Sequence, residues 1–79
     1  MTLLYFAQVR RITALASESL RGEVPLTSDE LWQYVLQRHP DLASLRPAIR
    51  LARNGEFASA ETIFQPGDEI ALIPPVSGG

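Results

Sequence analysis

The sequence predicts an α+β fold of two layers, in which a sheet of short strands packs against one main helix. The strongest helical pattern spans Thr27 to His39, where a helix start signal precedes apolar residues at helical spacing. Short apolar segments on both sides are typical of strands, and the most apolar are Thr2 to Val9 and Glu69 to Ile73. Because one helix can cover only one face of such a sheet, we expect the other face to be open.

The segment before the helix is predicted to form a strand hairpin. Thr2 to Val9 is apolar, aromatic and bounded by charge, as expected for a buried strand. Arg10 to Ala16 has no clear period and is compatible with one helical turn. Ser17 to Val24 is polar and alternates weakly, which favours an edge strand paired with the first.

The helix prediction depends on its first turn and on one apolar stripe. Thr27 and Glu30 have the spacing of a capping box, in which a hydroxyl and a carboxylate each bind a free backbone N–H. The residues of the stripe are Leu31, Trp32, Val35, Leu36 and His39. Pro40 is expected to end the helix, because a proline disfavours helical backbone in the residue before it.

The segment after the helix is predicted to form the rest of the sheet. Asp41 to Pro47 is a connection with room for a turn of helix, and Ile49 to Arg53 alternates like a half-buried strand. Asn54-Gly55 is a strong hairpin signal, because both central positions of a type I′ turn need positive φ. Glu56 to Ala58 would be the return strand.

The chain is expected to close with its last strand in the middle of the sheet. Thr62 to Phe64 and a turn at Pro66-Gly67-Asp68 lead into the apolar segment Glu69 to Ile73. The first and last strands are the most apolar, so we expect them to be neighbours where both faces are best shielded.

Composition excludes several classes of function. The 79 residues are 46% hydrophobic and 20% charged with a net charge of −2, which is ordinary globular composition and no footprint for nucleic acid or membrane. There is no cysteine, and all seven basic residues are arginine. Basic residues do not precede the first apolar run, and no apolar run is long enough to span a membrane, so we expect a soluble cytoplasmic protein.

The side chains do not suggest a free-standing catalyst. His39 is the only histidine, and at a helix C-terminus it is expected to have a structural role. Asp29 and Glu30 complement the dipole at the start of the same helix, and Asp68 and Glu69 flank a turn. We therefore expect no metal site, and no cofactor bound by the chain itself.

The last six residues form a distinctive tail, Pro74-Pro75-Val76-Ser77-Gly78-Gly79. The two prolines stop strand pairing and hold the backbone near polyproline II, in which six residues span roughly 19 Å. Gly78 and Gly79 carry no side chain, so the tip fits a narrow channel. We divide the chain into a domain of residues 1–73 and a tail of residues 74–79. By itself, this pattern fits a functional terminus and a frayed end equally well.

The tail and three internal motifs resemble the MoaD family, the small subunits of molybdopterin synthase. The motifs are Phe6-Ala7-Gln8-Val9-Arg10, Asn54-Gly55-Glu56, Pro66-Gly67-Asp68-Glu69 and the run from Ala71 to Gly79. The resemblance implies a ubiquitin-like β-grasp fold with a mixed sheet of about five strands on one main helix. At Arg11 and Ala14 the sequence departs from the family, which often has an acidic residue and a glycine there.

The resemblance also implies a role as a sulfur carrier. A MoeB-like adenylating partner would use ATP to activate the carboxylate of Gly79, and a sulfur donor protein would convert it to a thiocarboxylate. The tail, from Pro74 through Gly78, would then insert into a MoaE-like large subunit that holds the pterin precursor and the catalytic side chains. The implied assembly is a heterotetramer of two small and two large chains, in which this chain donates sulfur for molybdenum cofactor biosynthesis.

Three other interpretations stay open. A ThiS-like sulfur carrier for thiamin biosynthesis shares the fold and the Gly-Gly end. A ubiquitin-like modifier, joined through Gly79 to lysines of target proteins, fits the same terminus. A β-grasp interaction module with a frayed end needs no chemistry at Gly79.

The open face of the sheet is the expected docking surface. Alternation along the last strand separates Ile70 and Leu72, which we assign to the core, from Ile73. Ile73, together with Pro75, Tyr5 and Arg10, is expected to form an apolar patch that binds partners.

Overall fold

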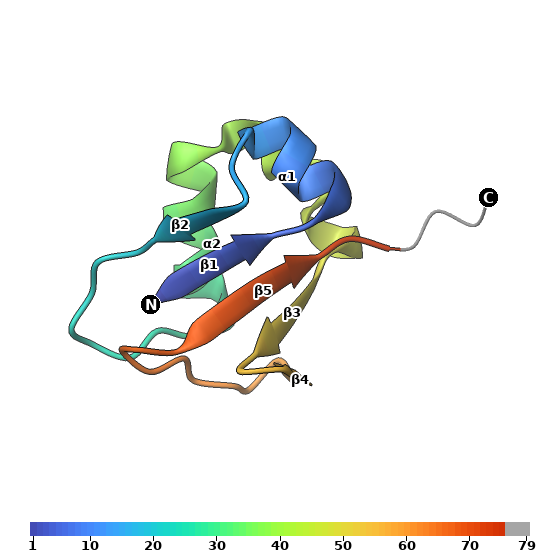
Figure 1. The fold of residues 1–79 in the computed structure, drawn as a ribbon. Coiled ribbons are helices and arrows are strands. Elements are labelled where there is room, and N and C mark those ends of the chain that lie inside the picture. Colours follow the sequence, from blue (N-terminus) through green and yellow to red (C-terminus); the bar gives the residue numbers. More distant parts are fainter. Residues whose placement is uncertain (76–79) are drawn as a thin grey trace.

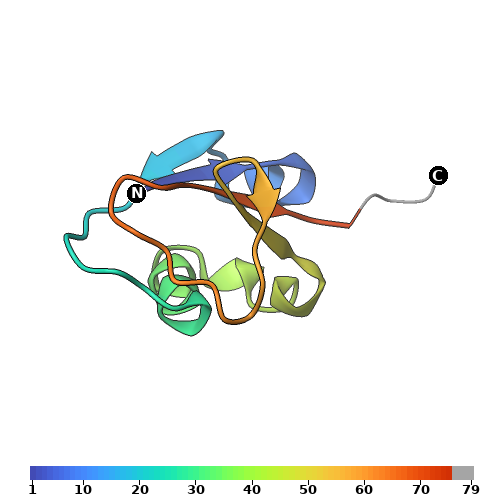
Figure 2. The same cartoon turned by 90° about the horizontal axis from the view of Figure 1, so that it is seen from below.

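The computed structural model describes residues 1–75 and shows the two predicted layers (Figures 1 and 2). The main elements are β1 (Thr2–Tyr5), α1 (Ala7–Thr13), β2 (Ser17–Ser19), α2 (Ser28–Arg38), β3 (Arg50–Arg53), β4 (Glu56–Phe57) and β5 (Glu69–Ile73). Two 3-10 turns, Pro40–Leu42 and Arg46–Ala48, connect α2 to β3. Figure 2 shows α2 and these turns forming a layer against one face of the sheet.

The sheet has five strands in the order β2-β1-β5-β3-β4. β1 and β5 are parallel, whereas the other neighbouring pairs are antiparallel, so the sheet is mixed as the resemblance implied. The prediction that the first and last strands are central neighbours is confirmed. β5 is therefore paired with β1 up to Leu72 and with β3 up to Ile73.

The predicted first strand is too long, because β1 ends at Tyr5 and α1 begins at Ala7. Phe6 is still extended, and Ala7 has a φ of 48°, which turns the chain away from the sheet. α1 buries Val9 completely and ends at Ala14, whose φ is 62°. A short apolar run does not by itself distinguish a strand from a helix, which explains the error.

The predicted second strand is correct at its start only. β2 pairs antiparallel with β1, placing Glu18 opposite Leu3, and it lies at the edge of the sheet. After Ser19 the chain leaves the sheet. Leu26 then makes an isolated antiparallel bridge to Phe64, and both side chains are buried.

α2 confirms the predicted helix and its capping box. The Thr27 hydroxyl accepts the Glu30 backbone N–H at 3.2 Å, and the Glu30 carboxylate accepts the Thr27 backbone N–H at 3.0 Å. The helix ends at Arg38 with His39 as its C-cap, and Pro40 opens a 3-10 turn. The buried residues of α2 are Leu31, Trp32 and Val35.

The β3–β4 hairpin has the predicted turn. Asn54 and Gly55 have φ values of 51° and 89°, which a type I′ turn requires at both positions. The Asn54 side chain also binds the start of β5, since its oxygen accepts the Glu69 N–H at 2.9 Å and its amide donates to Asp68 at 3.0 Å. This pairing connects the hairpin to the strand that leads to the tail.

The core lies between the sheet and α2, and residues from every layer contribute to it. Leu3, Tyr5, Ile70 and Leu72 point into it from the two central strands. The remaining buried members are Val9, Leu20, Leu26, Leu31, Trp32, Val35, Leu42, Ile49 and Phe64. Because all of this packing is on one side, no helix of residues 1–75 covers the opposite face of the sheet (Figure 2).

Candidate functional site

The tail begins where the central strand ends. Ile73 is the last residue of β5, Pro74 is buried and outside any strand, and Pro75 is exposed. The root of the tail is therefore fixed by a strand that is hydrogen-bonded on both sides. Residues 76–79 lie outside the described residues, so the predicted roles of Val76, Ser77, Gly78 and Gly79 stay predictions.

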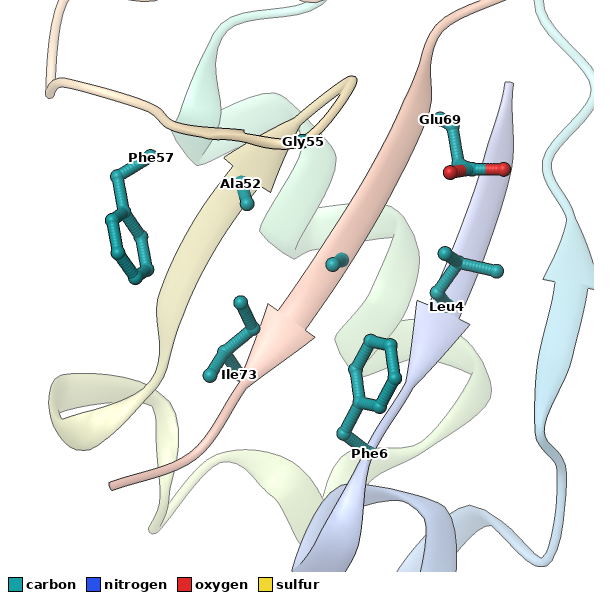
Figure 3. A pocket seen from close by; sticks show the side chains of 8 residues that line it. Leu4, Phe6, Ala52, Gly55, Phe57, Glu69 and Ile73 are labelled. Atoms are coloured by element: carbon teal, nitrogen blue, oxygen red, sulfur yellow. The ribbon is translucent and has the colours of Figure 1, made fainter. Parts of the chain in front are cut away.

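The open face of the sheet carries an apolar hollow of about 240 Å³ (Figure 3). Side chains of β1, β3, β4 and β5 line it, with α2 behind the sheet. The lining residues are Leu4, Phe6, Ala52, Gly55, Phe57, Glu69, Ala71 and Ile73. Contiguous exposed apolar surface of this kind marks interaction sites in soluble proteins.

Strand alternation explains why these residues share one face. Ile70 and Leu72 are fully buried under α2, whereas Ala71 and Ile73 are partly exposed on the other side. The predicted register of β5 is confirmed. That Ile73 contacts a partner stays a prediction.

Two aromatic residues account for much of the exposed apolar surface. Phe6 is 46% exposed, and Phe57 is 58% exposed. Phe6 precedes the turn at Ala7, and Phe57 is paired with Ala52 across the hairpin. We did not predict either residue as part of the patch. For Phe57 the signal was available, because alternation across the Asn54-Gly55 turn places it beside Ala52.

A second hollow, of about 540 Å³, adjoins the first at the root of the tail. Phe6 and Ile73 line both hollows, so the apolar surface continues from the sheet to the tail. The other lining residues are Ala7, Gln8, Arg11, Pro74 and Pro75. The predicted place of Pro75 in this surface is thus consistent with the structure.

Tyr5 does not belong to the docking patch, which corrects our prediction. It is paired with Leu72 in the register of β1 and β5, and both side chains point to α2. Tyr5 is only 2% exposed, and its hydroxyl donates to Glu18 at 2.7 Å. Leu4, the neighbour that alternation turns outward, takes the place that we assigned to Tyr5.

Arg10 is also displaced from the predicted patch. It is exposed, but it lies in the last turn of α1 and lines neither of the two hollows. The neighbouring Arg11 lines the hollow at the tail root instead. The prediction failed because it extended β1 through a segment that is helical.

A polar network joins the edge of the sheet to the end of α2. The Glu18 carboxylate accepts the Tyr5 hydroxyl at 2.7 Å and the Arg38 guanidinium at 3.0 Å, and His39 Nε2 lies 2.9 Å from it. Burial, then the bond to Glu18, raise the pKa of Tyr5. Partial burial acts to raise the pKa of Glu18, but its hydrogen bonds to Tyr5, His39 and Arg38 hold it below the usual value. His39 therefore has the structural role that we predicted.

Within residues 1–75, no cluster of three histidine, cysteine or acidic side chains has the geometry of a metal site. The helices of this part of the chain are also too short or too polar to cross a membrane.

Comparisons with known proteins agree with this architecture. The ThiS family model matches residues 3–79. The human molybdopterin synthase sulfur carrier subunit is 40% identical, over 98% of this chain and 91% of the human protein. The crystal structure of SAMP1 from Haloferax volcanii superimposes with a TM-score of 0.83 at 27% identity, over 99% of this chain and 97% of that one.

A further structure is a complex of subunits 1 and 2 of the molybdopterin-converting factor from Helicobacter pylori. It matches with a TM-score of 0.68 at 23% identity, over 99% of this chain and 96% of that one, and this likeness supports the fold. The family model matches almost every residue, and the human carrier subunit is 40% identical over nearly the whole chain. This chain therefore belongs to the ThiS family and has full-length relatives among the sulfur carrier subunits of molybdopterin synthase.

Proposed function

We propose that this chain is the sulfur carrier subunit of a molybdopterin synthase and that Gly79 carries the sulfur as a thiocarboxylate. The observation that carries this proposal is the 40% identity to the human carrier subunit across 98% of the chain. The fold supports it, because the central strand β5 leads directly into the tail beside an open apolar face.

The first step is activation of the Gly79 carboxylate. A carboxylate is a poor electrophile, because its leaving group would be oxide. An adenylating partner of the MoeB type joins the carboxylate to AMP and releases pyrophosphate from ATP. The product is a mixed anhydride, whose AMP leaving group departs easily.

The second and third steps move sulfur. A sulfur nucleophile supplied by a donor protein attacks the acyl carbon, and AMP leaves, so that Gly79 ends in a thiocarboxylate. The thiocarboxylate sulfur then attacks a carbon of the pterin precursor and displaces an oxygen substituent, which gives a thioester. Water cleaves the acyl–sulfur bond of this thioester, restoring the Gly79 carboxylate and leaving the sulfur on the pterin. Two such transfers supply both sulfur atoms of the dithiolene. The catalytic side chains belong to the large subunit.

The geometry of the tail root suits these transfers. β5 is paired on both sides up to Leu72 and with β3 up to Ile73, and Pro74 is buried, so the start of the tail is fixed. A fixed start lowers the entropy cost of bringing the reacting atom into each partner's site. The sequence contains no lysine or cysteine side chain, so none in the chain can intercept the activated acyl group.

The apolar face around Ile73 is the docking surface for the partners. Its position beside the tail root allows one interface to hold the body of the carrier while the tail enters a channel. The partners are a large subunit of the MoaE type, in an assembly of two small and two large chains, and the adenylating enzyme. Both would use the same face in turn, because both must receive the same tail.

The experiment that tests this proposal is intact-mass measurement of the protein purified from its own cells. We expect a fraction heavier by the difference between sulfur and oxygen, and a fragment spectrum that places the change on Gly79. Deleting the adenylating enzyme should abolish this fraction. A chain that never carries sulfur, or one whose sulfur passes to a thiamin precursor and not to the pterin, would overturn the proposal.

A protein-modifier function is the second candidate, and the likeness to SAMP1, a small archaeal modifier protein, favours it. A modifier remains attached to its targets through an amide, whereas a carrier returns to a free carboxylate. A denaturing gel with an antibody to this chain separates the two. Heavier species that disappear without the adenylating enzyme would indicate modification.

A further inference from the structure

The open face of the sheet carries a charged group at each end. Glu69 lines the hollow at the start of β5. Arg50 is paired with Ile73 at the other end of β5, so the two side chains share a face. The four residue steps from Glu69 to Ile73 correspond to roughly 13 Å along the strand. The apolar centre of the face therefore separates a carboxylate from a guanidinium, which lies at the tail end.

Arg50 is held in place by an aromatic ring. Its guanidinium carbon lies 3.8 Å from the centroid of the Phe57 ring, within the range of a cation–π contact. Stacking occupies the flat face of a guanidinium and leaves the N–H donors on its edge free for another group. Both residues are exposed, so the donors are accessible.

Three other arginines donate to groups within the chain. Arg46 pairs with Asp29 at 2.7 Å, Arg38 pairs with Glu18, and Arg53 donates to the Ile63 carbonyl at 3.0 Å. Among residues 1–75, no carboxylate lies within ion-pair distance of Arg50. Arg50 is thus an ordered cation at the rim of an apolar docking face, with its charge not neutralised by the described part of the chain.

We propose that Arg50 determines partner specificity by binding a carboxylate side chain of the large subunit, at the mouth of the channel that receives the tail. The inference rests on the function proposed above. A planar guanidinium recognises a carboxylate through two parallel hydrogen bonds, which adds direction to the contact. Because Glu69 marks the opposite end of the face, a partner with its carboxylate at the wrong end meets repulsion, and the carrier docks in one orientation.

The test measures association of the carrier with the large subunit from the same organism, by stopped flow at low and high salt. Arg50→Glu reverses the charge, and Arg50→Met removes it but keeps an aliphatic stem over Phe57. Arg21→Glu is the matched control, because Arg21 is exposed in the connection after β2, at the end of the sheet away from the tail (Figure 1). Thermal unfolding of each variant verifies the fold.

We expect Arg50→Glu to slow association by about tenfold or more at low salt, with a smaller effect for Arg50→Met. The difference should shrink at high salt, because salt screens exposed charges. Arg21→Glu should stay within about twofold of the unaltered chain, since its charge change is the same but lies off the interface.

Two results would overturn the inference while leaving the proposed function intact. One is Arg50→Glu associating as fast as Arg21→Glu. The other is a loss that does not depend on salt, which would mean that Arg50 acts only by packing on Phe57. If the unaltered chain itself fails to bind the large subunit, the proposed function falls, and the inference falls with it. The binding of the unaltered chain in the same series distinguishes these failures.

Discussion

At the scale of the residue, side chains along β5 alternate between the core, where they stabilise the fold, and the open face, which we propose as the docking surface. Ile73 faces the open side beside Phe6, whereas Leu72 is fully buried under α2. Ile73→Asp places a charge in the docking face, so we expect binding to the large subunit and to the adenylating enzyme to weaken by roughly tenfold or more. Affinity measurements with both partners test this expectation.

Leu72→Ala is the control for Ile73→Asp. It removes a fully buried side chain, so the free energy of unfolding should fall by about 2–5 kcal/mol. Ile73→Asp should cost clearly less, since the side chain is partly exposed. Unchanged binding by a folded Ile73→Asp chain would exclude Ile73 from both interfaces.

Backbone conformation predicts opposite effects for the same substitution at two alanines. Ala14 ends α1 with a φ of 62°, whereas Ala43 has a helical φ of −57°. Glycine adopts positive φ without the steric cost that alanine bears. We expect Ala14→Gly to raise the free energy of unfolding by up to about 1 kcal/mol and Ala43→Gly to lower it by a similar amount. Urea unfolding of both variants tests the signs, and an equal loss at both sites would contradict the prediction.

At the scale of the element, the Glu18 network holds the edge strand β2 against the end of α2. Because the folded-state pKa of Glu18 is lowered, the ionised carboxylate stabilises the fold above its unfolded-state pKa of about 4.3. This stability is lost as the pH falls through the lowered pKa. At neutral pH we expect Glu18→Gln to reduce the free energy of unfolding by roughly 1–2 kcal/mol.

The decisive measurement is how the difference in free energy of unfolding between the unaltered chain and Glu18→Gln depends on pH. The free energies of unfolding of the unaltered chain and of Glu18→Gln should converge only once the pH has fallen below the lowered pKa of Glu18, where the carboxylate of the folded chain is protonated. Tyr5→Phe removes one donor to the carboxylate, so it should reduce the difference without abolishing it. A difference that stays constant down to strong acid would show that the ionisation of Glu18 has no part in it.

The elements differ in how far the sequence alone predicted them. α2 and the hairpin carry local signals, the capping box of Thr27 and the Asn54-Gly55 turn, and both were predicted correctly. The start of α1 was assigned to the first strand, because its apolar residues continue the pattern of β1 and the turn at Ala7 has no glycine to mark it, whereas a helical turn after Arg10 was left open. The placement of Tyr5 depends on the pairing of β1 with β5, which are distant in sequence, so no local pattern contains it. The chemistry of Gly79 came from the family resemblance.

At the scale of the whole molecule, the domain places the root of the tail beside the apolar face that we propose as the docking surface. The core fills the space between the sheet and α2, so the opposite face is free for partners. The strand that supplies the centre of that face also supplies the tail. A partner that binds the face therefore receives the tail at a fixed distance from the interface, and the number of tail residues sets where the terminal carboxylate arrives.

Tail length should therefore be critical for chemistry and irrelevant to folding. Deleting Gly79 shortens the reach by one residue, about 3.3 Å, and adding an alanine after it lengthens the reach by the same amount and introduces a side chain. A misplacement of this size is enough to lose attack geometry, so both variants should fail to accept AMP or sulfur. Both should unfold at the temperature of the unaltered chain, because the core ends before the tail, and both should still bind the large subunit. Intact-mass measurement after incubation with ATP, the adenylating enzyme and a sulfur donor tests the prediction. Normal thiocarboxylate formation on the extended chain, without removal of the added residue, would show that the reacting group is not positioned by tail length.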